Sequence, residues 1–375
     1  MQPHVLFAIL DWGLGHATRS WPLIVAARNL GARVTIASRG AAGQWLDARM
    51  AEWDRANGVE GQPQWNRVEK PGVTIRYGRG WSTLPRIALQ MPGFIRSIAR
   101  ERRWTTAYAV EHGVTHVFSD NCYGARGALA GVNNVFMSHQ LQPPVPPIAR
   151  AAARGLVRRY ARRFDAVWVP DTALRNLAGG LAEPVSSPTR YVGPLSRFQA
   201  MSGAAPTEEA NDSAAATVLL GLVSGPEPQR TDMEQALRAC FLRDGRPALL
   251  LAGKPGGGEH REGNVLTVHD ADDGRFRRAI LEAECIICRS GYSTLLDLVT
   301  LGRKAVLIPT IGQPEQEGLA DEWRRKHGWT TLRLEDLRTY RPGPMTGRPV
   351  SANAPGPLAE MKHWLSTERH GNPDL

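Results

Sequence analysis

Short apolar runs alternate with longer segments of helical spacing along most of this chain. The first run, Val5 to Leu10, is followed by a polar turn containing glycines and then by a helical pattern to about Asn29. A second apolar run, Val34 to Ala37, begins the pattern again. Uniformly apolar runs of this length are typical of strands buried on both faces of a parallel sheet. The pattern therefore predicts βαβ units with right-handed crossovers.

The same alternation continues through most of the chain, and a stretch without it separates two halves. Residues 202–216 are rich in Ala, Gly, Thr and polar residues, which is typical of an interdomain linker. We therefore expect an α/β protein with two Rossmann-like domains. The expected parts are an N-terminal domain at 1–198, a linker at 199–216, a C-terminal domain at 217–350, and a C-terminal helix and tail at 351–375.

Length and composition agree with this division. A chain of 375 residues is long enough for two domains, and its apolar content of 42% can fill two cores. No run approaches the roughly 18 apolar residues of a membrane span. Met1 to Leu10 lacks the basic start and cleavage site of a signal peptide. The cysteines form no paired framework, so we expect all of them to be buried and reduced in a cytoplasmic protein: Cys122, Cys240, Cys285 and Cys288.

The net charge of +10 suggests an anionic partner. Segments 86–104 and 148–164 interleave arginines with apolar residues, as do ordinary amphipathic helices and helices that lie on anionic membranes. The arginine clusters lack the stacking aromatics of a recognisable nucleic-acid module. We therefore expect no nucleic-acid partner. Peripheral binding to the inner face of a membrane stays open.

One stretch in the second half combines a strand, a turn of small residues and a helix. The apolar run Cys285 to Cys288 leads into a polar turn and then a helical pattern. A helix N-terminus after such a turn favours phosphate, and hydroxyl side chains add donors. Ligands of open α/β sheets bind beyond the ends of the strands. The candidate donor-binding residues here and after the next strand are Arg289, Ser290, Gly291, Ser293, Thr294, Asp297, Gln313, Glu315 and Gln316.

Two other strands are followed by glycine-containing turns. The first turn contains Gly13 and Gly15, but Thr18 occupies the third position of the dinucleotide fingerprint G-x-G-x-x-G. The following strand ends at Arg39 rather than at an acidic residue, so an NADP enzyme stays open. The other turn contains Ser224 and Gly225, and the helix after it begins near Arg230, a candidate phosphate ligand.

The order of these motifs resembles the family-28-type glycosyltransferases, which include the peptidoglycan N-acetylglucosaminyltransferase. The similar segments are the G-x-G-His16 loop, the His139–Gln140 pair, the Gly225 turn and the run from Cys288 to Gln316. Asp297 stands where the family usually has Glu. The resemblance implies a GT-B architecture with the donor site in the cleft between the two domains.

The resemblance also implies a reaction. It is inverting transfer of a hexosyl or N-acetylhexosaminyl group from a UDP-sugar to an acceptor hydroxyl, with a lipid-linked acceptor among the alternatives. His16 is the expected general base, because imidazole accepts a proton near neutral pH, and Asp11 is the alternative base. His139 and Gln140 are expected on the acceptor side. Helix N-termini and arginines would balance the charge on the leaving UDP, so no metal or other cofactor is expected.

Some features allow other interpretations. Asp270 and Asp272 match a metal-binding Asp-x-Asp, although an aspartate there also suits a helix N-cap. A UDP-sugar 2-epimerase-like enzyme of the same fold would need carboxylates on both faces of the sugar, and the first turn offers only Asp11. A non-catalytic basic binding protein is the third alternative.

Overall fold

The computed structural model describes residues 2–59, 65–73, 83–185, 188–201, 218–225, 227–253, 257–351 and 354–367, without the side chains of 83–88. Residues 202–217, which hold most of the expected linker, and residues 368–375 of the expected tail lie outside this description. The chain forms two compact units. The first comprises Met1–Ala200 and Asn353–Leu375, and the second comprises Met201–Ala352.

The first unit is built on a parallel seven-stranded sheet in the order β3-β2-β1-β4-β5-β6-β7. β2 and β4 flank β1, so the winding direction reverses between β1 and β4, where open α/β sheets bind ligands. The strands are β1 (His4–Ile9), β2 (Arg33–Ala37), β3 (Trp65–Val68), β4 (His116–Asp120), β5 (Asn133–Met137), β6 (Ala166–Val169) and β7 (Thr189–Tyr191).

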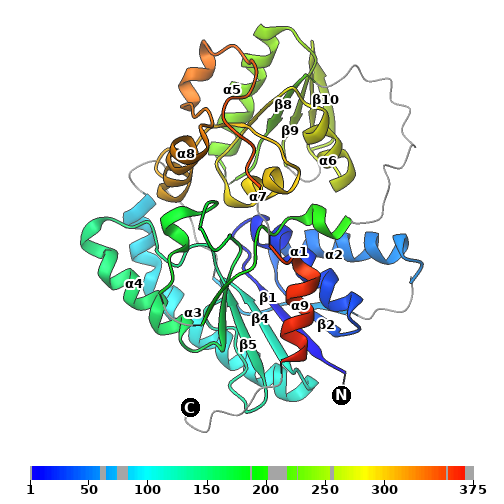
Figure 1. The fold of residues 1–375 in the computed structure, drawn as a ribbon, viewed down its shortest axis with the longest axis vertical. Helices are drawn as coiled ribbons and strands as arrows, with labels where there is room; N and C mark the ends of the chain where they lie inside the picture. The colour runs from blue at the N-terminus through cyan, green and yellow to red at the C-terminus, as the bar shows by residue number, and fades with distance from the viewer. Residues whose placement is uncertain are drawn as a thin grey trace. The chain divides into compact units, whose positions relative to one another are not determined.

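Helices cover both faces of this sheet. Phe7 and Ile9 of β1 face the core shared with α1 and α9, whereas Leu6 packs with Ala109 of α3. This alternation follows from the two-residue period of a strand. The helices of the unit, shown in Figure 1, are α1 (Gly15–Asn29), α2 (Gly40–Ala56), α3 (Thr83–His112), α4 (Pro147–Ala161) and α9 (Pro357–Ser366).

The C-terminal helix α9 returns to the first unit. The indole Nε1 of Trp364 donates to Oδ1 of Asn133 at 3.0 Å, and its ring contacts Trp168 with centroids 5.8 Å apart. Glu360 pairs with Arg190 of β7. A buried indole with its N–H satisfied both fills a core and fixes an orientation. α9 therefore completes the core on the α1 face of the first sheet.

The second unit is built on a six-stranded sheet in the order β10-β11-β9-β8-β12-β13, with only β10 antiparallel to its neighbour. Here the winding reverses between β8 and β12. The strands are β8 (Leu219–Leu222), β9 (Ala248–Leu251), β10 (Glu259–Glu262), β11 (Val265–Val268), β12 (Cys285–Cys288) and β13 (Val306–Leu307). The helices are α5 (Gln229–Asp244), α6 (Asp273–Glu282), α7 (Tyr292–Thr300) and α8 (Pro314–His327).

The cysteines and the aspartate at the start of α6 were both the subject of sequence predictions. All four cysteines are buried and unpaired, as predicted. The carboxylate of Asp272 accepts a hydrogen bond from the backbone N–H of Arg275 at 2.7 Å and so caps α6. Within the described ranges, no group of three or more His, Cys, Asp or Glu side chains could hold a metal ion. The cap on α6 is the one that the sequence allowed for an aspartate at this position.

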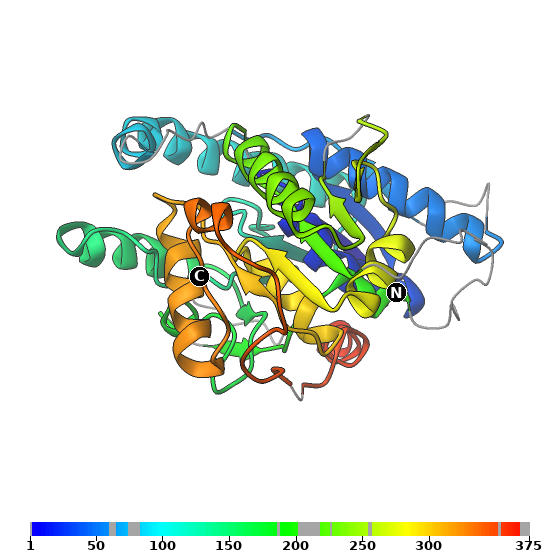
Figure 2. The same ribbon diagram turned by 90° about the horizontal axis from the view of Figure 1, so that it is seen from above.

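The two arginine-interleaved segments form α3 and α4. Their N-terminal parts project to the same side of the first unit in both views (Figure 1 and Figure 2). Ile148 is 96% exposed and Leu89 is 83% exposed, beside exposed arginines on both helices. Among the helices in the described part of the chain, none is long and apolar enough to cross a membrane.

Candidate functional site

A carboxylate, an arginine and two histidines come together where the winding of the first sheet reverses. β4 ends at Asp120, which is fully buried, and Oδ1 of Asp120 lies 2.9 Å from Nδ1 of His16 in α1. Oδ2 accepts from Nε of Arg19 and from Oγ of Ser20, both at 2.9 Å. Arg19 also donates to Oδ1 through Nη2. Both carboxylate oxygens are therefore fully engaged.

The environment of Asp120 keeps it ionised. Burial by itself would raise the pKa of this carboxyl group, but the charges and hydrogen bonds of Arg19 and His16 hold the pKa well below its usual range. A permanently charged carboxylate 2.9 Å from an imidazole can fix both the orientation and the tautomer of the ring. Neither Asp120 nor Arg19 was among the site residues predicted from the sequence. The available signal was an aspartate ending a predicted strand.

The first turn brings His16 to this carboxylate. Gly13 has a φ of +107°, a conformation that side chains with a Cβ rarely adopt, and α1 begins two residues later at Gly15. His16 follows in the first turn of the helix. Its side chain is 16% exposed, so part of the ring reaches solvent. The turn thus presents a partly accessible imidazole supported by a buried carboxylate.

Arg19 connects the two histidines. Its Nη2 lies 2.8 Å from Nδ1 of His16, and its Nη1 lies 2.8 Å from Nδ1 of His139. A guanidinium only donates, so His139 accepts at Nδ1 and carries its proton on Nε2. At His16, the same reasoning gives two arrangements. If Nδ1 donates to Asp120, Nε2 is free to accept a proton; if Nδ1 accepts from Arg19, Nε2 carries the proton.

The remaining residues predicted for the first unit are the acceptor-side pair His139–Gln140 and the alternative base Asp11. His139 is 5% exposed and lies two residues after the end of β5. The backbone N–H of Gln140 donates to Oγ of Ser138 at 3.0 Å. Asp11 follows β1, and its Oδ2 accepts from Nε of Arg39 at 2.7 Å. Proton uptake by Asp11 would neutralise its side of this ion pair. Which of His16 and Asp11 acts as the base stays a prediction. The ion pair with Asp11 also occupies Arg39, the residue on which the NADP alternative depended.

The second unit carries a buried arginine at the corresponding place in its sheet. Arg289 directly follows β12 and is 4% exposed. Its Nη1 and Nη2 donate to Oγ1 of Thr310 and to the carbonyl of Gln229, which are both uncharged. Its Nε has no hydrogen-bond partner among the described residues. Burial lowers the pKa of Arg289 to about 10, against an opposing contribution from Asp232. This cation lacks a carboxylate bonded to it, and an anionic ligand would satisfy it.

The charge of Arg230 is balanced in a different way. Its Nε donates to Glu227 at 2.7 Å, and its Nη1 donates to Glu234 at 2.8 Å and to the carbonyl of Ala252 at 3.1 Å. The side chain is 6% exposed. Two carboxylates therefore compensate Arg230 within the second unit. Of the two arginines expected near the donor phosphates, Arg289 is the one whose hydrogen-bond partners carry no charge.

The glycine turn after β8 passes beside Arg289. Gly225 has a φ of +108°, and a Cβ placed on it would lie 3.9 Å from Nε of Arg289. Ser224 and Gly225 are exposed, whereas Pro226 lies outside the described residues. β8 and β12 are neighbours in the sheet, which explains why turns more than sixty residues apart in the chain meet. The two turns therefore form one edge of the second unit.

A hydrogen-bonded network joins this edge to α8. Gln316 accepts through Oε1 from the backbone N–H of Thr310 at 3.0 Å and from its hydroxyl at 2.9 Å. Its Nε2 donates to Oε1 of Gln313 at 2.7 Å, and its carbonyl accepts from Oγ of Ser290 at 2.7 Å. Because Thr310 also contacts Arg289, the polar cluster after β13 is part of the same arrangement.

α7 begins beside these residues. Gly291 is its N-cap residue and provides no side-chain cap. Ser293 and Thr294 lie half-buried in the first turn, and Glu315 lies half-buried in the first turn of α8. Asp297 is 5% exposed, in the second turn of α7. The roles of these residues toward a sugar nucleotide stay predictions.

Several solved structures resemble this chain in fold. No protein-family model matches the chain, and no curated protein sequence matches it. Among solved structures, the glycotransferase of kitacinnamycin is 15% identical, with a TM-score of 0.57 over 90% of this chain and 89% of that one. The glycosyltransferase SnogD from Streptomyces nogalater is 17% identical, with a TM-score of 0.55 over 98% and 96%. An Arabidopsis thaliana protein complexed with UDP-L-rhamnose is 11% identical, with a TM-score of 0.55 over 92% and 87%.

These similarities confirm the predicted fold class. The chain has an α/β architecture of two Rossmann-like parts, and it shares the GT-B fold of these glycosyltransferases over most of its length. Identities of 11–17% establish the fold alone. The specific resemblance to the peptidoglycan N-acetylglucosaminyltransferase stays a prediction.

Proposed function

We propose that this protein is an inverting glycosyltransferase that moves a hexosyl or N-acetylhexosaminyl group from a UDP-sugar to an acceptor hydroxyl. The observation that carries the proposal is the contact of 2.9 Å between His16 and the buried carboxylate of Asp120. The pair lies where the first sheet reverses its winding, in a fold shared with glycosyltransferases. Imidazole oriented by a carboxylate is an effective general base near neutral pH.

The chemistry assigned to the first unit is proton removal. Nε2 of His16 takes the proton of the acceptor hydroxyl while the hydroxyl oxygen attacks the anomeric carbon. The bond from that carbon to the UDP oxygen breaks, and UDP leaves with the electron pair. Asp120 then stabilises the imidazolium through Nδ1–H. A single displacement places the new bond opposite the old one, so the configuration at the anomeric carbon inverts.

The chemistry assigned to the second unit is donor binding. The diphosphate carries negative charge that increases on the leaving oxygen as the bond breaks. Arg289, the N-terminus of α7 and the turn at Gly225 supply a cation and backbone N–H groups at one edge of the sheet. Asp297 is assigned the ribose hydroxyls, as the family resemblance implies. The proposal includes no metal ion.

UDP is expected to raise the melting temperature of the protein equally in EDTA and in Mg²⁺, because arginine and N–H groups meet the diphosphate. Asp297→Ala should weaken UDP binding by about 1–3 kcal/mol, the cost of an unpaired buried polar partner. Thermal-shift titration with UDP-, GDP-, TDP- and ADP-sugars measures both effects and tests the nucleotide preference. Asp270→Ala is the matched control, since Asp270 belongs to the alternative metal motif. Stabilisation that disappears in EDTA or in Asp270→Ala would contradict the metal-free assignment.

A lipid-linked acceptor and a peripheral position on an anionic membrane are a further part of the proposal. The support is the exposed face of α3 and α4, where arginines surround exposed apolar side chains such as Ile148 and Leu89. Cationic amphipathic helices with exposed apolar residues bind anionic lipid surfaces. The proposal places the enzyme in the cytoplasm, at the inner face of the membrane.

Replacing Arg96, Arg100 and Arg103 together with glutamine should reduce binding to anionic vesicles. Each basic residue near such a surface contributes roughly 1 kcal/mol, and the contribution decreases with added salt. Co-sedimentation with phosphatidylglycerol-containing and pure phosphatidylcholine vesicles provides the measurement. A triple replacement of the exposed Arg261, Arg324 and Arg325 removes the same charge from the second unit and serves as the control. Equal binding to both kinds of vesicle would exclude this membrane role.

A further inference from the structure

The loop between β4 and β5 carries Arg126 beside α3. The backbone N–H of Ala128 donates to Oγ1 of Thr106 in α3 at 3.3 Å, and the backbone N–H of Gly127 donates to Oδ1 of Asn134 in β5 at 2.8 Å. Nδ2 of Asn134 donates back to the carbonyl of Gly127 at 3.2 Å. Arg126 therefore projects from a loop that is fixed on one side by α3 and on the other by the start of β5.

Arg102 approaches this loop from α3. It stands four residues before Thr106, so the two side chains lie on the same face of the helix. At about 100° per residue, this face is turned at least about 100° from the side chains of Arg96, Arg100 and Arg103. Arg102 therefore belongs to a different surface of α3 from the one to which membrane binding was assigned.

Arg163 approaches the same loop from the end of α4. Asp165, which directly precedes β6, accepts from the backbone N–H of Asn134 at 2.7 Å, and Arg163 stands two residues before Asp165. Cζ of Arg163 lies 5.3 Å from the centroid of the Tyr160 ring. One helix, one loop and the end of a second helix thus each supply a guanidinium. We call the three residues the arginine cluster: Arg102, Arg126 and Arg163.

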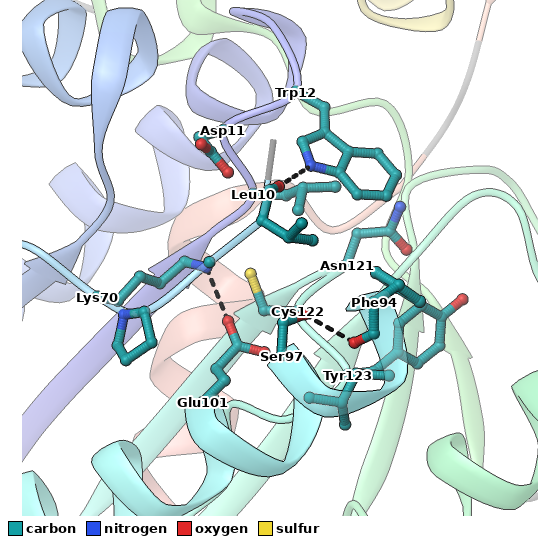
Figure 3. A pocket seen from close by; sticks show the side chains of 14 residues that line it. Leu10, Asp11, Trp12, Lys70, Phe94, Ser97, Glu101, Asn121, Cys122 and Tyr123 are labelled. Carbon is teal, nitrogen blue, oxygen red and sulfur yellow. Dashed lines mark hydrogen bonds and ion pairs between the residues drawn. The ribbon is translucent and has the colours of Figure 1, made fainter. Parts of the chain in front are cut away.

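The positive charge of the arginine cluster exceeds the negative charge around it. Among the residues that the structure describes, none forms a hydrogen bond or an ion pair with these three guanidinium groups. The pKa of Arg126 is lowered by burial first and then by the charges of the other two, against an opposing contribution from Asp165. Glu101, beside Arg102 in α3, is already engaged by Nζ of Lys70 at 2.7 Å (Figure 3). Three positive charges against the one carboxylate of Asp165 leave an excess of two.

The arginine cluster is anchored at the opposite end of the first sheet from the catalytic candidates. Asn134 is the second residue of β5, and Asp165 directly precedes β6, so the anchoring contacts lie at the amino ends of these parallel strands. Asn134 pairs in register with Val117, three residues before Asp120. At about 3.3 Å per residue, three residues span roughly 10 Å. The arginine cluster is therefore separate from the carboxylate that contacts His16.

We propose that the arginine cluster binds a phosphomonoester, that is, a phosphate group with a single organic substituent. The two excess positive charges match the charge of about −1.5 to −2 that such a group carries near neutral pH. Each planar guanidinium presents parallel N–H donors that fit two phosphate oxygens. Arg126 and Arg163 are half-buried, which reduces the screening of their charges by solvent. A soluble phosphorylated compound and a lipid headgroup share this chemistry. The site goes beyond the proposed glycosyl transfer and does not depend on it.

The test compares phosphomonoesters with singly charged diesters on the full chain. Calorimetry titrates glycerol 3-phosphate against dimethyl phosphate. Co-sedimentation compares phosphatidylcholine vesicles that contain phosphatidic acid, a phosphomonoester lipid, with vesicles of equal surface charge that contain phosphatidylglycerol, a diester lipid. The variants are Arg126→Gln and Arg163→Gln. Arg55→Gln, which removes an exposed charge from the last turn of α2, is the matched control, and Arg289→Met tests for phosphate binding in the second unit.

We expect the phosphomonoester to bind at least about tenfold more tightly than the diester in at least one of the two pairs of probes. Arg126→Gln and Arg163→Gln should each weaken this binding about tenfold, whereas Arg55→Gln and Arg289→Met should retain it. The pair that shows the preference identifies the source as a free compound or a lipid. Binding should also weaken by up to about tenfold from pH 8 to pH 5, because phosphate loses its second charge near pH 6 while arginine stays charged.

Thermal melting separates a binding role of Arg126 from a structural one. Arg126→Gln removes no ion pair and relieves the repulsion from two like charges, so the melting temperature of the unliganded variant should not decrease. A decrease in melting temperature, with phosphate binding unchanged in Arg163→Gln, would show that Arg126 is structural and would overturn the proposal. Equal binding of monoesters and diesters, failure of both monoester probes, equal weakening by Arg55→Gln, or a loss confined to Arg289→Met would overturn it as well.

Discussion

Replacing His16 with alanine lowers kcat by a factor of about 10² to 10⁴, the range for a lost general base. The affinity for UDP changes little, because the residues assigned to the donor belong to the second unit. The physical reason is the loss of Nε2 as proton acceptor beside a carboxylate that is held ionised. Steady-state kinetics with a UDP-sugar, together with calorimetric titration of UDP, measure both quantities.

Two controls make the His16 result specific. His363→Ala removes an exposed histidine from α9 and should leave kcat unchanged. Asp120→Asn should also lower kcat, because the amide no longer holds the tautomer with Nδ1–H, although it also disturbs Arg19. If turnover survives His16→Ala but collapses in Asp11→Asn, the base is Asp11. If donor affinity and turnover decrease together, His16 has a structural role.

Replacing Arg289 with methionine weakens UDP binding by about 10- to 150-fold, which corresponds to the 1.5–3 kcal/mol of a hydrogen bond to a charged group. The melting temperature of the unliganded protein should change by roughly a few degrees. Arg289 is a buried cation without a bonded carboxylate, so its replacement also removes the cost of desolvating the guanidinium. Arg289→Lys keeps the charge without the planar guanidinium, so its UDP affinity should lie between those of the unaltered protein and Arg289→Met. Calorimetry and thermal melting with and without UDP provide the measurements.

Arg230 is the matched control for Arg289. Arg230→Gln leaves Glu227 and Glu234 without their shared partner, so it should lower the melting temperature of the unliganded protein. Its effect on UDP affinity should be smaller than that of Arg289→Met. If Arg230→Gln abolishes UDP binding while Arg289→Met does not, the assignment of the two arginines is reversed.

The parts of the fold that were predictable are those with an apolar pattern. β1 and β12 are buried throughout, and the apolar runs Val5 to Leu10 and Cys285 to Cys288 indicated this directly. β10 was not predicted. Its residues, Glu259 to Glu262, are all exposed and carry no apolar pattern, because an edge strand is fixed by backbone pairing to β11 rather than by burial.

The candidate site was partly predictable for a related reason. Sequence patterns identify the ends of strands, but they do not show that β4 lies beside β1, and only this neighbourhood brings Asp120 to His16 across 104 residues. The partners of Arg230 are a different case. Glu234 stands four residues after Arg230 within α5, so this ion pair was visible in the sequence. Glu227 precedes the helix, and its ion pair with Arg230 depends on the turn.

The most direct measurement is the fate of the sugar when the protein is incubated with UDP-sugars and a hydroxylated acceptor. Mass spectrometry detects the glycoside, and NMR reads the configuration of its anomeric carbon. We expect a glycoside formed in step with UDP and with inverted configuration, β from an α-linked donor, and at least about a hundredfold less product in His16→Ala. Recovery of an epimerised UDP-sugar, retention of configuration, or binding of UDP-sugars without any product would contradict this expectation.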